Sequence, residues 1–115
     1  MPKAVKIDVC GVMTEVDNMF ADEDYRKMKT HDSWALHVPM KWQPSFRLSL
    51  VCKGIFEEDD DFNLTASFLY YHLYSNNGKP SSGIVETVWI TNEDENGLVD
   101  LTVQEVRSIL EKVKQ

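Results

Sequence analysis

Five consecutive carboxylates are the residues in this chain with the clearest capacity for chemistry. These residues are Glu57, Glu58, Asp59, Asp60 and Asp61. They lie between two strongly apolar runs. Carboxylate oxygens in such a run can bind a hard cation, attract a basic partner, or only keep a turn hydrated. A second acidic group, Glu93, Asp94 and Glu95, follows later in the chain.

The chain of 115 residues has a formal net charge of −7, and the acidic excess is confined to its second half. Residues 1–56 carry eight basic and seven acidic side chains, whereas residues 57–115 carry four basic and twelve acidic ones. A negative field opposes binding to nucleic-acid phosphates and to anionic membranes, and it attracts cationic partners. The sequence therefore predicts a basic protein surface as the partner, with no direct nucleic-acid contact and no membrane contact.

Sequence motifs that would specify catalysis are missing. The patterns GxSxG, GxxxxGK[ST], GxGxxG and HExxH do not occur in the chain. Cys10, Cys52 and His72 could form a thiolate–imidazole pair, but no local pattern favours one. We therefore expect a protein that is not an enzyme, with no catalytic residues and no cofactor.

Metal binding is another chemistry that the acidic residues could support. Residues 92–97, NEDENG, resemble the start of a calcium loop because oxygen-bearing side chains alternate before a glycine. The position that should supply a bidentate glutamate is Val103, so any calcium binding would be weak. The three histidines, His31, His37 and His72, lack ligand spacing. No metal site is predicted.

A single globular domain is expected over residues 1–115, because 43% of the residues are hydrophobic and no linker interrupts the chain. No leader sequence or membrane-spanning run is apparent, which predicts a soluble, cytoplasmic protein. Cys10 and Cys52 lie in apolar, strand-like patterns and are expected to be buried free thiols.

Alternating apolar residues predict about five β-strands. The predicted strands cover residues 5–9, 34–42, 46–56, 62–74 and 84–91. Pro39 cannot donate a backbone hydrogen bond, so the strand that contains it is expected at an edge of the sheet. Residues 22–29 have acidic side chains first and basic ones last, an order that favours a short helix.

A carboxyl-terminal helix is predicted to begin after Thr102, because Thr102 and Glu105 form a capping box. Its apolar face consists of Val103, Val106, Ile109, Leu110 and Val113. This face must be covered by the sheet. The expected fold is α+β, an antiparallel β-meander of about five strands, curved or barrel-like, packed against a C-terminal α-helix.

In such a meander, alternate turns lie at the same end of the sheet, so turns 57–61 and 92–97 should lie side by side. Eight carboxylates would then gather at one pole of the molecule and form a dock for a cationic surface. Acidic turns can also serve only to keep hairpins soluble and to discourage pairing between sheet edges.

Aromatic residues suggest a second surface. Tyr71, with Leu69 and Leu73, is predicted on the second face of the sheet, where it could contact a partner or be buried in a homodimer. The sequence thus predicts a non-catalytic acidic domain that binds, and inhibits or sequesters, a basic macromolecule, as an immunity-type or anti-defence-type inhibitor does. The alternative is a small-ligand or peptide-binding module with a groove between the last helix and the sheet.

Overall fold

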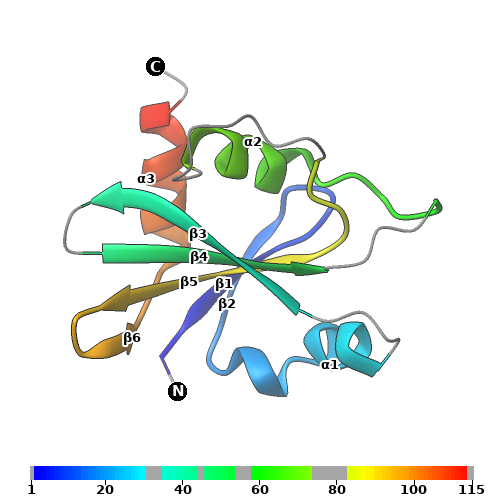
Figure 1. Cartoon of the computed structure of the whole chain (residues 1–115), viewed down its shortest axis with the longest axis horizontal. Helices are drawn as coiled ribbons and strands as arrows, with labels where there is room; N and C mark the ends of the chain where they lie inside the picture. The colour runs from blue at the N-terminus through cyan, green and yellow to red at the C-terminus, as the bar shows by residue number, and fades with distance from the viewer. Residues whose placement is uncertain (1, 31–34, 44–45, 54–57, 74–82, 114–115) are drawn as a thin grey trace.

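The computed structural model describes residues 2–30, 35–43, 46–53, 58–73 and 83–113. The predicted α+β class is confirmed: an antiparallel sheet is packed against a C-terminal helix, and the sheet is open and not closed into a barrel (Figure 1). The elements in chain order are β1 (Ala4–Ile7), β2 (Met13–Val16), the 3-10 helix η1 (Met19–Ala21), α1 (Glu23–Thr30), β3 (Ala35–Gln43), β4 (Phe46–Lys53), α2 (Leu64–Leu73), β5 (Val88–Asp94), β6 (Gly97–Val99) and α3 (Val103–Val113).

Strand β5 is the centre of the sheet, whose order is β2-β1-β5-β4-β3 with every pair antiparallel. One edge of β5 is shared by two short strands, because β1 pairs with residues 88–90 and β6 pairs with residues 92–94. Strand β3 lies at the far edge, which confirms the position predicted from Pro39.

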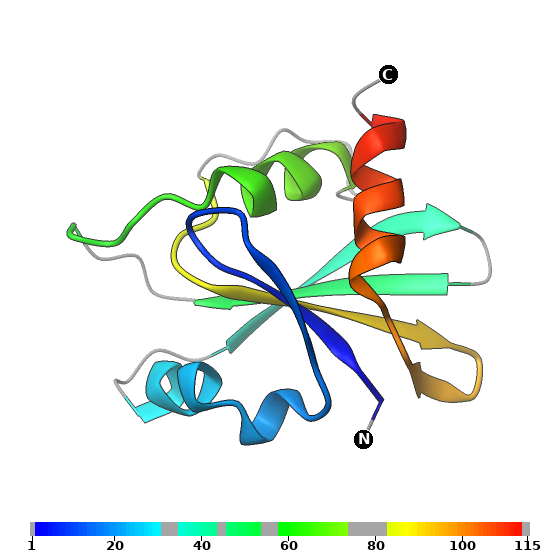
Figure 2. The ribbon, with the colours of Figure 1, turned by 180° about the vertical axis from the view of Figure 1, so that it is seen from behind.

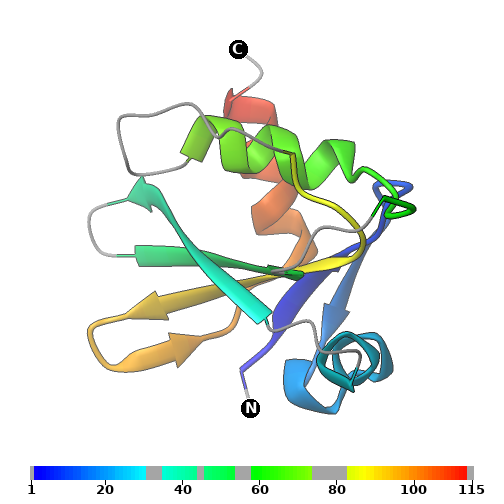
Figure 3. The same cartoon turned by 45° about the vertical axis from the view of Figure 1, so that its right-hand side comes forward.

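The two faces of the sheet are covered by different helices (Figures 2 and 3). Val88 and Ile90 belong to the main core, which they share with buried residues of α2 and α3. Trp89 points to the opposite face and belongs to a smaller core with Tyr25 of α1. Successive residues of β5 therefore supply both cores, because side chains alternate along a strand. None of the described helices is long and apolar enough to cross a membrane.

Local sequence explains the ends of the helices. The predicted capping box of α3 is confirmed, since Glu105 N donates to Thr102 Oγ1 (3.1 Å) and Thr102 N donates to Glu105 Oε1 (3.2 Å). The predicted short helix over residues 22–29 is confirmed as α1. Strand β1 is shorter than expected, because the turn to β2 already begins at Asp8 and includes Gly11 with a φ of 84°.

The prediction of a strand over residues 62–74 is wrong, because these residues contain helix α2. Apolar residues are so dense there that they satisfy the helical spacing as well as the alternating one. Ala66, Leu69 and Leu73 are buried, and they lie on one side of a helix. Asn63 precedes this helix as its N-cap and accepts a hydrogen bond from Ala66 N (3.0 Å).

Helix α2 also makes the predicted pairing of the two acidic turns wrong. Arg47, at the start of β4, pairs with Glu93 near the end of β5, whereas Val51 pairs with Trp89 near its start. The described acidic residues that follow β4 therefore lie at one end of the sheet, and the β5–β6 turn lies at the other (Figure 1). The described carboxylates of the two groups do not form one pole.

Asn63 joins three segments that are distant in the sequence. Its side chain is fully buried, and Nδ2 donates to the carbonyl oxygens of Ile7 (3.1 Å) and Glu86 (2.9 Å). Its backbone N donates to the carbonyl oxygen of Ile84 (2.9 Å). Residues 84–87, predicted as strand, are held here ahead of β5, with one bridge between Phe62 and Val85.

We expect Asn63→Ala to lower the free energy of unfolding by about 2–4 kcal/mol, because α2 loses its cap and the carbonyls of Ile7 and Glu86 lose the donor that Asn63 supplies. Denaturant unfolding followed by circular dichroism measures this loss. Asn96→Ala, in the exposed β5–β6 turn, is the matched control and should change stability by less than about 0.5 kcal/mol. Equal losses in both variants would contradict the role assigned to Asn63.

The two cysteines differ, and the prediction that both are buried is wrong for Cys10. Cys10 is exposed in the β1–β2 turn, whereas Cys52 is buried in the main core, where burial raises its pKa to about 11.

We expect a thiol reagent to modify Cys10 in the folded protein and Cys52 only after unfolding. Ionisation of Cys52 should lower stability only as the pH rises from its ordinary pKa of 9.0 towards about 11. Rapid modification of both thiols in the native protein would contradict this.

Candidate protein-binding surface

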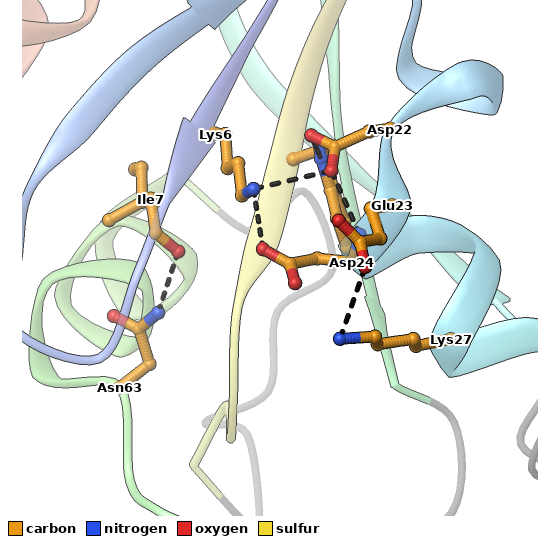
Figure 4. Close-up of polar contacts among 8 residues, drawn as sticks. Lys6, Ile7, Asp22, Glu23, Asp24, Lys27 and Asn63 are labelled. Atoms are coloured by element: carbon orange, nitrogen blue, oxygen red, sulfur yellow. Dashed lines mark hydrogen bonds and ion pairs between the residues drawn. The ribbon is translucent and has the colours of Figure 1, made fainter.

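A cluster of charged residues joins α1 to the sheet (Figure 4). Asp22 Oδ1 accepts hydrogen bonds from Lys6 Nζ (3.2 Å) and from the backbone N of Asp24 (3.0 Å), and Asp22 Oδ2 accepts one from Trp89 Nε1 (3.3 Å). Burial tends to lower the pKa of Lys6, but its hydrogen bonds to Asp24 and Asp22 and their negative charges raise that pKa overall.

The cluster has a structural explanation. Asp22 caps the first turn of α1 and attaches that turn to β1 and β5 at the same time. Its carboxylate is nearly buried, with a side-chain exposure of 8%, and its described contacts all serve this attachment. The contacts within the protein therefore account for the burial of this carboxylate.

Of the described acidic residues that precede α2, one has a structural role and three are exposed. Asp60 forms an ion pair with Lys53 (2.6 Å) in which both side chains are largely buried. Glu58, Asp59 and Asp61 are exposed. Glu57 lies outside the described residues. The three exposed carboxylates at residues 58, 59 and 61, called the acidic segment below, are the part that remains available to a partner.

The backbone of the acidic segment is fixed next to α2. Asp61 N donates to Glu86 Oε1 (2.9 Å), and Glu86 N donates to the carbonyl oxygen of Asp61 (2.8 Å). Glu86 adopts a φ of 60°, which side-chain-bearing residues rarely adopt. These contacts hold the backbone of Asp61 just before the first turn of the helix.

The second predicted acidic group lies apart from the first, at the β5–β6 hairpin. Glu93 lies 4.0 Å from Arg47, and Asp94 Oδ1 accepts a hydrogen bond from Asn96 N (2.8 Å). Glu95 is exposed in the turn. These residues therefore form a separate surface.

Helix α2 exposes apolar side chains on the side opposite its buried residues. Leu64 is 70% exposed and Tyr71 is 49% exposed. Half-buried Phe68 lies between them at helical spacing and also packs against the main core. The helix contains no aspartate, glutamate, lysine or arginine. Tyr71 is thus exposed as expected, but on a helix, so the predicted aromatic sheet face with Leu69 and Leu73 is wrong.

A further exposed apolar residue, Phe62, lies in the chain just before the N-cap of α2. It is 53% exposed, and its ring lies so close to Gly83 that a Cβ added there would be 2.0 Å from Phe62 Cε2. We call Phe62, Leu64, Phe68 and Tyr71 the α2 surface. Sequence reasoning found only Tyr71, although the absence of charge from residue 62 to residue 74 could have indicated the rest.

Comparison with protein-family models, curated proteins and solved structures gave no significant match. Within the described ranges, no three histidine, cysteine or acidic side chains converge in a way that could hold a metal ion. The functional interpretation therefore depends on the α2 surface and on the acidic segment beside it.

We expect Asp22→Ala to lower the free energy of unfolding by about 2–3 kcal/mol, because α1 would lose its cap and its attachment to the sheet. Asp22→Asn keeps an acceptor for Asp24 N and should lose less. Glu15→Ala, on exposed β2, is the control for loss of one negative charge, and denaturant unfolding measures all three variants. A loss for Asp22→Ala no larger than that for Glu15→Ala would show that the cluster does not hold α1.

Proposed function

We propose that the protein is a non-catalytic binding module that recognises a basic and apolar segment of another protein through the α2 surface and the acidic segment. The observation that carries the proposal is helix α2, which contains no aspartate, glutamate, lysine or arginine and exposes Leu64 and Tyr71. Bound in this way, the module would cover a basic surface of its partner and so inhibit or sequester it.

Apolar exposure supports this function. Leu64 and Tyr71 lie seven residues apart, or about 10 Å along a helix, so a partner can contact both at once. Contiguous exposed apolar residues are uncommon on proteins that act alone. Covering leucine and aromatic side chains is especially favourable, because it removes a large apolar area from water. The α2 surface would therefore supply most of the affinity.

Charge supports the choice of a basic partner. Glu58, Asp59 and Asp61 are exposed in the segment that leads into α2, and the whole chain has a net charge of −7. A second copy of this chain would bring the same charge and be repelled, whereas a cationic segment would be steered towards the surface. A basic partner thus fits better than a homodimer.

The alternative of a ligand groove between α3 and the sheet has less support. Val106, Ile109 and Leu110 of α3 are buried in the main core with Leu48 and Ile90. These side chains occupy the space between the helix and the sheet where the ligand would have to lie.

A displayed library of random peptides tests the proposal directly. We expect the protein to select peptides that combine lysine or arginine with aliphatic or aromatic residues, and their affinity to fall steeply between about 0.05 and 0.5 M salt. Isothermal titration calorimetry with the selected peptides measures the effect. Selection of uncharged peptides, or affinity that does not depend on salt, would overturn the role of the acidic segment.

Two pairs of variants locate the contact. Neutralising the acidic segment (Glu58→Gln, Asp59→Asn and Asp61→Asn) should weaken binding about tenfold, as should Tyr71→Ser. The matched controls are Glu93→Gln, Asp94→Asn and Glu95→Gln, which change the net charge equally, and Leu98→Ser on exposed β6. Equal effects of the two triple variants would mean that net charge, not this surface, governs binding.

A further inference from the structure

The face that α2 presents is shaped to receive a helix. Leu64, Phe68 and Tyr71 are spaced as i, i+4 and i+7, which forms a ridge that fits between the side-chain rows of a second helix. The backbone groups of α2 bond within the helix, so the surface has no strand edge to which an extended peptide could add as a further strand. The apolar part of the partner is therefore expected to be helical.

The acidic segment makes the two ends of α2 different for a partner. It leads into Asn63, the N-cap of α2, so the chain of the acidic segment approaches the helix from its amino end (Figure 1). Exposed Tyr71 lies near the other end, in a last turn whose basic side chain is His72. The acidic segment thus lies before one end of α2, and the helix itself contains no carboxylate.

A partner helix stabilises basic side chains best in its own last turn, where they face the negative end of its dipole. In its first turn the same side chains would oppose the dipole and fray the helix. Lysine or arginine can therefore meet the acidic segment without this penalty when the last turn of the partner lies over the amino end of α2. In that arrangement the two helices are antiparallel, so the positive end of each helix dipole lies beside the negative end of the other, which is favourable.

Resting on the proposed function, we infer that the partner segment is an amphipathic helix that lies antiparallel to α2, with its basic residues in its last turn beside Glu58, Asp59 and Asp61. Its apolar residues cover Leu64 and Tyr71. This arrangement requires about three turns of helix, because α2 itself has ten residues.

Two synthetic peptides of about 14 residues, or four turns, provide the test. Both have the same composition, an apolar stripe and blocked ends, but one carries its lysines in the last turn and the other in the first. We expect the first peptide to bind at least tenfold more tightly in fluorescence anisotropy. Neutralising Glu58, Asp59 and Asp61 should reduce this preference to less than about twofold.

Cys10 allows the orientation to be measured independently of affinity. It is exposed in the β1–β2 turn, and that turn adjoins the amino end of α2, because a Cβ added at Gly11 would lie 3.0 Å from Thr65 Oγ1. A nitroxide attached to Cys10 should broaden the NMR signals of the last residues of the bound peptide. The Cys10→Ser protein treated with the same reagent is the control.

The outcomes separate this inference from the function on which it rests. Broadening at the first residues of the peptide, equal affinity of the two peptides, or no binding of either would overturn the antiparallel helix. The proposed function would still stand if the displayed library yields salt-sensitive basic peptides. If the library yields none, the proposed function fails as well.

Discussion

The buried side chain of Asn63 is the constraint on which the arrangement of this molecule depends. Its amide bonds to Ile7 at the end of β1 and to Glu86 ahead of β5, while its oxygen caps α2. One side chain thus sets where the helix begins and how it meets two strands of the sheet. Because the side chain is fully buried, water cannot readily replace a lost bond, so the positions of the three segments depend on one another.

The position of α2 determines the distribution of charge. A strand in place of α2, between β4 and β5, would have brought the two acidic groups to the same end of the sheet. The helix instead carries the chain back across one face, so Glu58, Asp59 and Asp61 remain at the start of α2 and Glu93 to Glu95 lie at the far hairpin. Acidic groups that share one end in the predicted meander are therefore separated.

Features that depend on neighbouring residues could be predicted from the sequence. The capping box of Thr102 and Glu105, the edge position required by Pro39, and the charge order of α1 are all local and were found. Helix α2 was missed because its apolar residues satisfy two periodicities, and because the bond that selects the helix joins residues 56 positions apart. The exposed positions of Leu64 and Phe62 follow from that choice, so they were missed with it.

Asn63 also begins the tripeptide Asn63-Leu64-Thr65, which has the form of an acceptor for N-linked glycans. Transfer of a sugar uses the amide nitrogen, and in this fold both hydrogens of that nitrogen are held by backbone carbonyls in the interior. Glycosylation and folding of this chain are therefore mutually exclusive. A chain passing through a secretory compartment would have to fold before the sugar is added, or it could not adopt this structure.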